Sequence, residues 1–333
     1  MSELRWDERL REWVIVAPHR QDRTYHPVSC PLCPDTEGDT ELPTADFEIA
    51  VFENRFAPMR TDVPLPPVLA AADSHDGTHA LLARAGDARV ATESYGRCEV
   101  VVYTPEHEGS LGELPLDRVE ALLRVWAHRY ESLSCIDGVR YVFIFENRGA
   151  EIGVTLSHPH GQIYAYPFVP APAARETAIE ADHLARTGHC LHCDIIEAER
   201  ANASRILIDD GLVAAYVPYA ARWSYEVHIA VRNHRASLSE MDARERRSLA
   251  SALKSVLQAY DRLFGRPMPY LLSVRQRATA GDTHDGAHLR IELLPALRTP
   301  DKLKFRAGSE TFMGVFINDV QPEDAAANLL KVL

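Results

Sequence analysis

The segment 157–162 reads S-H-P-H-G-Q and carries two histidines separated by one proline. Alternate residues of a strand share a face, and a residue before proline is extended, so His158 and His160 are predicted to point the same way. One imidazole could then bind a metal ion while the other faces a substrate. A neutral histidine can displace a leaving group at phosphorus and form a phosphoramidate. We predict this role for His160, with Gln162 donating an amide hydrogen bond to a phosphate oxygen.

The residues just before this segment suit a phosphate group or a base. Glycine permits close approach of the backbone, and neutral polar side chains offer hydrogen bonds without charge repulsion. The candidates are Asn147, Gly149, Gly153, Thr155 and Ser157. A glycine-rich loop alone is more often a turn than a phosphate cradle, but its position directly before 157–162 favours phosphate binding.

Four of the six cysteines form two C-x-x-C pairs, a spacing that lets one turn present two thiolates to a tetrahedral metal ion. Distant histidines would complete each set. The first predicted zinc site is Cys30, Cys33, His107 and His158, and the second is Cys190, Cys193, His234 and His288. Four protein ligands leave no open position, so both sites should be structural.

Two other interpretations of the cysteine pairs remain. His189 and His192 lie beside the second pair and are alternative ligands. A dithiol redox pair is the rival function, although neither pair opens a helix after a thioredoxin-like strand.

The second half of the chain repeats the pattern of the first. Each half has a C-x-x-C pair, a strand, the phrase H-x-x-S-L-x-E (107–113 and 234–240), a helix and a final histidine segment. Agreement at this many offsets predicts an α+β fold of two tandem domains related by a pseudo-twofold repeat. We place the domains at 1–175 and 176–333, each an antiparallel sheet with flanking helices.

Apolar periodicity locates the elements that must position these residues. Strands are predicted at 13–17, 47–52, 98–103 and 141–145, and a helix at 116–133. The stretch 58–86, rich in proline, alanine and aspartate, is predicted to be irregular.

The composition limits the class of partner. The 333 residues carry a net charge of −12, so a dense basic surface for nucleic acid is not expected. No apolar run approaches the roughly 18–20 residues that span a bilayer, and the amino terminus is charged where a signal peptide is apolar. We expect a cytoplasmic protein without a membrane partner, in which paired cysteines favour metal binding over disulfides.

Six segments match one known family. They are W-V-I-V-A-P-H-R at 13–20, C-P-L-C at 30–33, V-F-E-N-R-F at 51–56, F-E-N-R-G-A-E-I-G at 145–153, S-H-P-H-G-Q at 157–162 and K-F-R-A-G-S-E at 304–310. Through them the whole chain resembles the galactose-1-phosphate uridylyltransferases of the histidine triad superfamily. The resemblance implies that His160 takes a uridylyl group from UDP-glucose, releases glucose 1-phosphate and passes the group to galactose 1-phosphate by a ping-pong route. Gln162 would steady the intermediate.

The resemblance also implies further roles. It places Phe52, Asn54 and Phe56 around the nucleoside, Arg20 and Asn147 at the phosphates, and Lys304 and Glu310 near the sugar phosphate. It further implies a homodimer whose active sites take residues from both subunits.

In one region the sequence departs from the family pattern, which includes an iron or zinc site of one glutamate and three histidines. Glu176 and His288 match, but Arg275 and Arg290 stand where histidines are expected, which argues against an iron site. Arg290 also occupies the repeat position of His160, so the second domain should lack a nucleophile. Ser309 stands where a tyrosine is common, which leaves sugar specificity open.

Alternative functions keep the same fold. With phosphate as the acceptor the enzyme would be a nucleotide-sugar phosphorylase acting on UDP-glucose or ADP-glucose, and with water it would be a hydrolase. A zinc-stabilised binding module without catalysis is the alternative from another class. The presence of both His160 and Gln162 argues against it, because a scaffold needs only His158.

Overall fold

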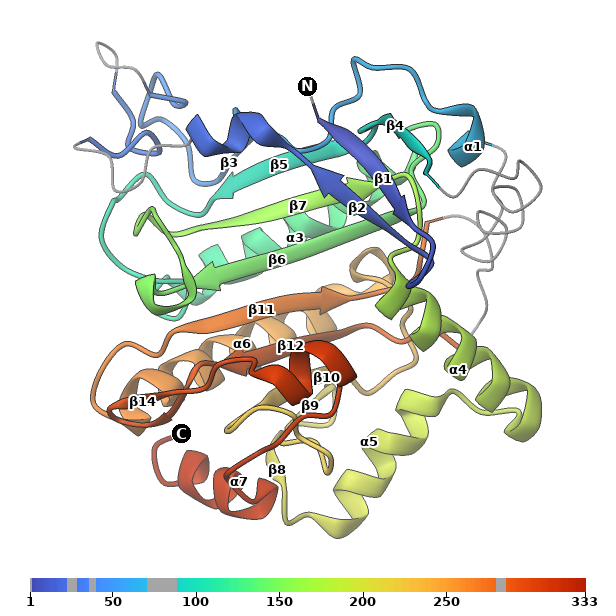
Figure 1. The fold of residues 1–333 in the computed structure, drawn as a ribbon. Coiled ribbons are helices and arrows are strands. Elements are labelled where there is room, and N and C mark those ends of the chain that lie inside the picture. The colour runs from blue at the N-terminus through green and yellow to red at the C-terminus, as the bar shows by residue number, and fades with distance from the viewer. Residues whose placement is uncertain (1, 23–28, 36–39, 71–88, 280–285) are drawn as a thin grey trace.

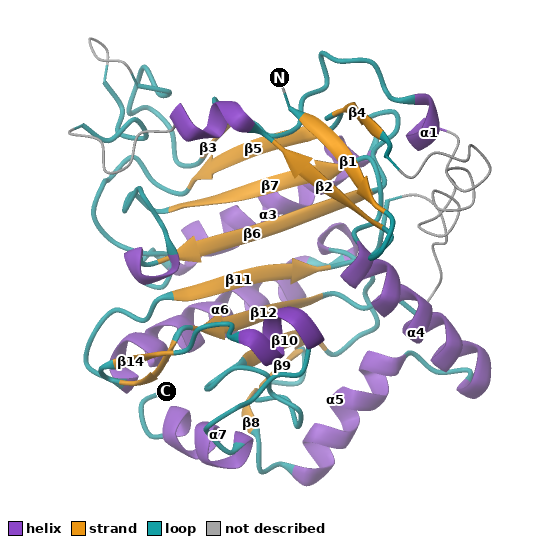
Figure 2. Cartoon of the chain, viewed as in Figure 1, coloured by secondary structure: helices purple, strands orange, loops and turns teal. Residues whose placement is uncertain are grey.

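The computed structural model describes residues 2–22, 29–35, 40–70, 89–279 and 286–333. A nine-stranded antiparallel sheet forms its centre (Figures 1 and 2). The first half supplies, in spatial order, β3 (Ala50–Glu53), β5 (Arg97–Val102), β7 (His160–Tyr166) and β6 (Tyr141–Arg148). The second half continues with β11 (Tyr270–Arg275), β12 (Arg290–Pro295), β10 (Val227–Val231), β9 (Val213–Tyr216) and β8 (Ile206–Asp209).

The two halves meet where β6 pairs with β11, in a register running from Arg148 opposite Tyr270 to Ile144 opposite Val274. Reading outward from this pair, the order β6, β7, β5 corresponds to β11, β12, β10. The predicted internal repeat and antiparallel pairing are confirmed, but the two sheets are joined into one. The proposed division between 175 and 176 falls inside helix α4 (Ala171–Thr187).

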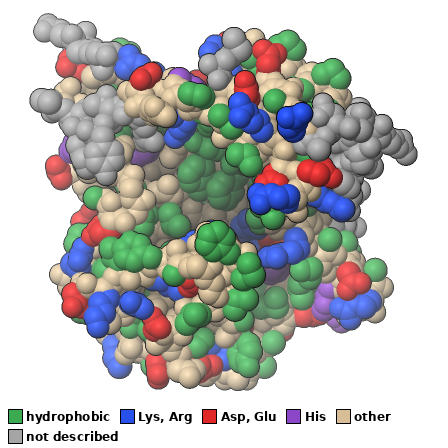
Figure 3. Space-filling model, in the orientation of Figure 1, with side chains coloured by type: hydrophobic (Ala, Val, Ile, Leu, Met, Phe, Trp, Pro, Cys, Tyr) green, Lys and Arg blue, Asp and Glu red, His purple; other side chains and the backbone are tan. Residues whose placement is uncertain are grey.

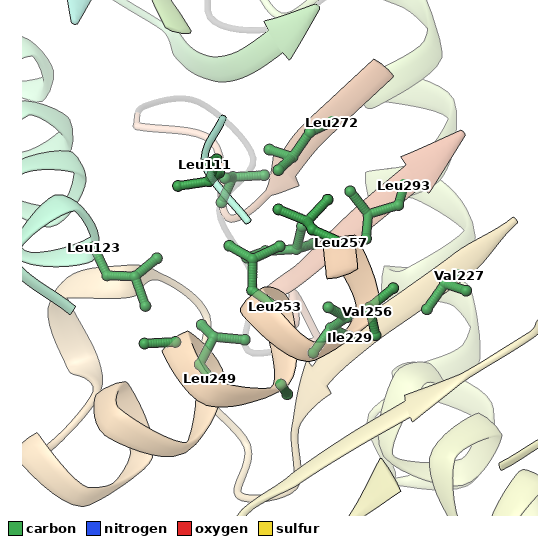
Figure 4. Close-up of a cluster of buried hydrophobic side chains, with 14 of the residues drawn as sticks. Leu111, Leu123, Val227, Ile229, Leu249, Leu253, Val256, Leu257, Leu272 and Leu293 are labelled. Carbon is green, nitrogen blue, oxygen red and sulfur yellow. The ribbon is translucent and has the colours of Figure 1, made fainter. Parts of the chain in front are cut away.

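Helices α3 (Leu116–Ser134) and α6 (Ala243–Leu263) cover one face of the sheet (Figure 1). Helix α6 begins at a capping box, in which Asp242 accepts from the backbone of Glu245 and Glu245 accepts in return. Its buried side chains recur at helical spacing and reach both α3 and the sheet (Figure 4). They include Leu249, Leu253, Val256, Leu257 and Tyr260.

Smaller elements surround this core. A three-stranded sheet is formed by β2 (Glu12–Val16), β1 (Glu3–Asp7) and β4 (Ala91–Glu93), and β13 (Leu297–Thr299) pairs with β14 (Lys302–Leu303). The remaining helices are α1 (Pro67–Ala70), α5 (Leu191–Asn202) and α7 (Pro322–Leu330). Single turns are η1 (Pro18–Asp22), η2 (Ala150–Ile152), η3 (Leu238–Glu240) and the π-helical turn η4 (Ser309–Met313). None of the described helices is long and apolar enough to cross a membrane.

Most predicted elements are present, with two differences. Strand β7 begins at His160, so His158 lies before the strand and the predicted H-P-H strand was wrong in extent. Strand β6 continues to Arg148, beyond the predicted end at Phe145, because pairing with β11 extends it. Of the stretch predicted to be irregular, residues 58–70 contain only the short helix α1, and residues 71–86 lie outside the described ranges.

The sheet face opposite α3 and α6 is hollowed and lined by hydrophobic side chains (Figure 3). Aromatic residues of β6 and β7 alternate there with fully buried residues of the other face. Phe143 stacks on Phe145, and Tyr164 packs against both Phe145 and Tyr166. His160 and Gln162 share this face with the two tyrosines, because side chains along β7 alternate.

Candidate active site and metal centres

His160 is held in one orientation by its neighbour. Its Nδ1 lies 2.8 Å from the carbonyl oxygen of His158, a contact that requires Nδ1 to carry the proton. In the neutral ring the lone pair is then on Nε2. This arrangement suits an attacking imidazole, because the tautomer is fixed before a substrate arrives.

Two cavities meet at His160. A cavity of about 230 Å³ is lined by His160, Gln162, Thr155 and the predicted nucleoside residues Phe52, Asn54 and Phe56. A cavity of about 340 Å³ is lined by His160 together with the predicted polar residues Asn147, Gly149, Thr155 and Ser157. The structure therefore gathers residues from β3, β6, β7 and the loop before β7 around one imidazole, which places it between a nucleoside-sized pocket and a polar one.

The turn after β3 shapes the smaller cavity. Asn54 Oδ1 accepts a hydrogen bond from the backbone N–H of Phe56 at 2.9 Å, and Asn54 also lines the cavity. Arg20 donates to the carbonyl oxygen of Phe56 at 3.0 Å and is not among the lining residues. Within one chain, Arg20 thus stabilises the turn without lining the cavity.

Glycines shape the larger cavity. Gly149 has φ of 108°, and a Cβ there would lie 2.5 Å from the side chain of Pro269, so any other residue would clash. Gly153 ends the turn η2 with φ of 85°, a backbone conformation that favours glycine. These conformations turn the chain back so that Thr155 and Ser157 reach the cavity wall.

The first cysteine pair and its two predicted histidines converge. Their ligand atoms lie within 4.8 Å of one another, with Cys33 Sγ 3.2 Å from His107 Nδ1 and 3.6 Å from His158 Nδ1. Ligands of a tetrahedral zinc ion are separated by about 3.5 Å. Burial lowers the pKa of His158, and its Nε2 donates to the carbonyl oxygen of Thr104 at 2.8 Å, which leaves Nδ1 to face the cysteines.

The second set converges in the same way. Cys193 Sγ lies 3.7 Å from His234 Nδ1 and 3.5 Å from His288 Nδ1, and His288 Nε2 donates to the carbonyl oxygen of Val231 at 2.7 Å. All four predicted ligands again lie within 4.8 Å. The alternatives His189 and His192 instead contact Asp194 and Glu180. Both sets could hold a metal ion.

The first cysteine loop also forms part of the smaller cavity. Pro31 and Leu32, between the two cysteines, line the smaller cavity, and Leu32 packs in a buried cluster with Phe52 and Leu156. A metal ion at Cys30 and Cys33 would therefore fix one wall of the pocket that contains His160.

The residues expected to form a second-domain iron site have a different arrangement. Arg275 and Arg290 both pair with Glu176, and Arg290 is also paired with Glu292 at 2.8 Å. Burial opposes the charge on Glu176, but Arg290 and Arg275 hold its pKa far below the usual value. Arg290 also lies 3.2 Å from His192. A divalent cation here would lie against two guanidinium groups, so these residues do not fit a metal ion.

Lys304 and Glu310 are not brought to His160. Lys304 Nζ pairs with Glu310 Oε1 at 2.8 Å, both side chains are buried, and neither lines the two cavities around His160. Their contact with a sugar phosphate stays a prediction.

Sequence reasoning missed Glu146, which is buried under the larger cavity. One signal was present: a glutamate interrupts the apolar strand Tyr141–Arg148 at the position that corresponds to Arg275 in the repeat.

These features define a class of protein. A tautomer-fixed histidine, close to a cysteine and histidine set that could hold a metal ion and between two cavities, fits the nucleotidyltransferase class of enzyme. Family models of the amino-terminal and carboxy-terminal domains of galactose-1-phosphate uridyl transferase match residues 1–170 and 176–333. The chain belongs to the galactose-1-phosphate uridylyltransferase family.

Individual relatives agree over nearly the full length. The galactose-1-phosphate uridylyltransferase of Thermotoga maritima is 37% identical over 99% of this chain and 98% of its own, and that of Streptomyces lividans is 35% identical over 99% and 87%. A solved structure described as a uridylyltransferase is 30% identical, with a TM-score of 0.84 over 99% of this chain and 98% of its own.

The arginine pairs of the second domain predict a change in metal content. Replacing both, Arg275→His and Arg290→His, should add about one metal ion per chain by elemental analysis after dialysis, because two imidazoles then join Glu176, Glu180 and His192. The matched control Arg275→Gln with Arg290→Gln removes the charges without supplying ligands and should add none. Equal metal content in the two double variants would contradict the interpretation.

Proposed function

We propose that this protein transfers a uridylyl group from UDP-glucose to a hexose 1-phosphate through a covalent bond to His160. The observation that carries the proposal is the 2.8 Å contact between His160 Nδ1 and the His158 carbonyl, at the junction of the two cavities. It directs the Nε2 lone pair of a neutral imidazole to a position between a nucleoside pocket and polar donors. The named activity of the family supports the choice of substrates.

In the first step, His160 Nε2 attacks the α-phosphorus of UDP-glucose. The new N–P bond forms as the bond from phosphorus to the oxygen of glucose 1-phosphate breaks, and glucose 1-phosphate leaves with the electron pair. The ring becomes positively charged, and the His158 carbonyl oxygen, which accepts a hydrogen bond from Nδ1–H, stabilises that charge. The proton therefore stays on Nδ1 throughout.

In the second step, a phosphate oxygen of galactose 1-phosphate attacks the same phosphorus and the N–P bond breaks. The electron pair returns to Nε2, and UDP-galactose is released. Tyr164 donates to Gln162 Oε1 at 3.4 Å, so the Gln162 amide N–H groups are turned toward other acceptors. They donate to a nonbridging phosphate oxygen, an interaction that contributes about a hundredfold or more when it strengthens in the transition state.

The uridine is expected to occupy the smaller cavity. Phe52 and Phe56 provide apolar contact, and Asn54 provides the polar contact. The phosphates then extend into the larger cavity, where Asn147, Thr155 and Ser157 supply neutral donors. Residues 1–175 form the catalytic domain in this proposal, and residues 176–333 support it.

Zinc is the metal that both cysteine and histidine sets favour, because each offers two thiolates and two imidazoles at tetrahedral separations. Zinc would supply rigidity at both cysteine loops and at the two histidines of each set. In the first domain, the side chain of His158 belongs to that set while its carbonyl orients His160.

We further propose a homodimer that completes the site. Lys304 and Glu310 are the buried ion pair of the segment 304–317, in which five large hydrophobic side chains are exposed. They are Phe305, Phe312, Met313, Val315 and Ile317. Phe312 is 79% exposed, and the hollow aromatic face beside His160 offers an apolar surface of the same kind (Figure 3). A partner subunit's segment seated there would bring Lys304 to the sugar phosphate.

The covalent step can be detected directly. Incubation with UDP-glucose labelled at the α-phosphate should leave acid-labile, base-stable label on the protein, because phosphoramidates hydrolyse in acid. His160→Ala should take up no label. Chasing labelled protein with galactose 1-phosphate should release UDP-galactose, whereas release by inorganic phosphate or water alone would identify a phosphorylase or a hydrolase. Label on the His160→Ala protein would exclude the assigned nucleophile.

Removing the first metal should weaken nucleotide binding. Cys33→Ser should lose one of about two zinc ions per chain and raise KM for UDP-glucose about tenfold, or about 1.4 kcal/mol, because the wall at Leu32 loosens. Cys193→Ser is the matched control, and it should lose the other ion with little change in KM. The coupling is refuted if both variants raise KM equally, or if neither does.

The dimer predicts a specific surface substitution. Phe312→Asp should convert the protein from twice 37.2 kDa to 37.2 kDa in light scattering and abolish transfer to galactose 1-phosphate. Leu10→Asp, at a turn where Leu10 is 61% exposed, should leave the dimer intact. A wild-type monomer in solution, or a dimeric Phe312→Asp protein, would contradict the proposal.

A further inference from the structure

Glu146 is a buried carboxylate that the transfer steps do not use. It lies near the end of β6 and is 5% exposed, on the face covered by helices, as Val142 and Ile144 are. It also contributes to the wall of the larger cavity, which His160 lines. Burying a carboxylate costs several kcal/mol unless hydrogen bonds compensate, so the partners of Glu146 need explanation.

Two fully buried tyrosines bind this carboxylate, one from each half of the chain. Tyr103, just after β5, donates from its hydroxyl to Glu146 Oε2 at 3.1 Å, and Tyr270, the first residue of β11, donates to Oε1 at 2.8 Å. Burial raises the pKa of Glu146 to about 7, although the hydrogen bonds from the two tyrosines lower it. The group therefore spans the seam between β6 and β11 and directs the Tyr103 hydroxyl.

The Tyr103 hydroxyl lies directly against the strand that carries His160. A Cβ at Gly161 would be only 2.2 Å from that oxygen, so glycine alone permits the approach. The backbone N–H of Tyr103 also donates to the carbonyl oxygen of Pro159 at 3.0 Å. Tyr103 thus contacts the residues on both sides of His160, and Glu146 fixes the part of the ring that contacts Gly161.

We propose that Glu146 is a positioning residue for uridylyl transfer, which acts through the Tyr103 hydroxyl on the backbone of Gly161 and so sets the place of the neighbouring His160 imidazole. Tyr103 lines neither cavity, and Glu146 lines only the larger one, where it is 5% exposed. Their loss should therefore slow the chemical step while nucleotide binding is retained. A displacement well below 1 Å is enough for such an effect, since attack requires the reacting atoms to be aligned.

The inference rests on the proposed function, and one measurement tests both separately: the single-turnover rate at which His160 takes up label from α-phosphate-labelled UDP-glucose. Tyr103→Phe and Glu146→Leu should each slow labelling about tenfold, with the Kd for UDP-glucose within about twofold. Glu146→Gln, which can still hydrogen-bond to Tyr103, should retain most of the rate. Because the two residues act in series, the double variant Tyr103→Phe with Glu146→Leu should also be about tenfold slow, not a hundredfold.

Tyr260→Phe is the matched control, because Tyr260 is equally buried and its hydroxyl donates to the Tyr225 carbonyl at 2.7 Å, away from His160. It should label at the wild-type rate. The positioning role is overturned if Tyr103→Phe labels as fast as wild type, if the double variant shows a hundredfold loss, or if Tyr260→Phe is equally slow. No label on the wild-type protein would instead overturn the proposed function itself.

Discussion

The hydrogen bond from His160 Nδ1 to the carbonyl oxygen of His158 links the proposed nucleophile to a residue of the first cysteine and histidine set. The ring of His158 faces the first cysteine pair, and its backbone orients the neighbouring imidazole. The backbone conformation at His158, a member of the first cysteine and histidine set, therefore determines the tautomer and orientation of the His160 ring. Leu32, which lies between the two cysteines of that set, lines the smaller cavity beside His160. The proposed nucleophile and the candidate metal ligand are coupled because they lie two residues apart on one stretch of backbone.

The two halves share a cysteine and histidine set but differ at the position of His160. Each has a convergent cysteine and histidine set whose inner histidine donates to a backbone carbonyl, Thr104 in one half and Val231 in the other. At the position of His160 the second half has Arg290, paired with Glu176 and Glu292. The second half thus has a cysteine and histidine set like that of the first half. Its Arg290, through the ion pair with Glu176, holds α4 to the sheet.

Much of this architecture could be predicted because its signals are local or periodic. The C-x-x-C pairs, the repeated histidine phrase and the apolar spacing of α3 identified the repeat and both ligand sets without knowledge of the fold. The environment of Glu146 could not be predicted in this way. Its partners Tyr103 and Tyr270 lie 43 and 124 residues away in the chain. The order β5, β7, β6 brings Tyr103 to Glu146, and the pairing of β6 with β11 brings Tyr270.

Long-range pairing also explains the other differences. The continuity of the two sheets depends on which strand edges meet, and alternation within a single strand carries no such information. The family pattern placed Lys304 and Glu310 near a sugar phosphate, whereas in one chain they are paired with each other. This distance from His160 is what we would expect if Lys304 and Glu310 contribute to the site of a second subunit.

The pairing of β6 with β11 has a consequence for the independence of the two halves. A fragment ending before β11 would leave the backbone groups of β6 exposed along a strand that pairs at five positions in the intact chain. Unpaired strand edges of this kind promote association between molecules. The repeat therefore comprises two similar units, but we expect each to depend on the other for its strand pairing, and the intact chain to unfold as a single cooperative body.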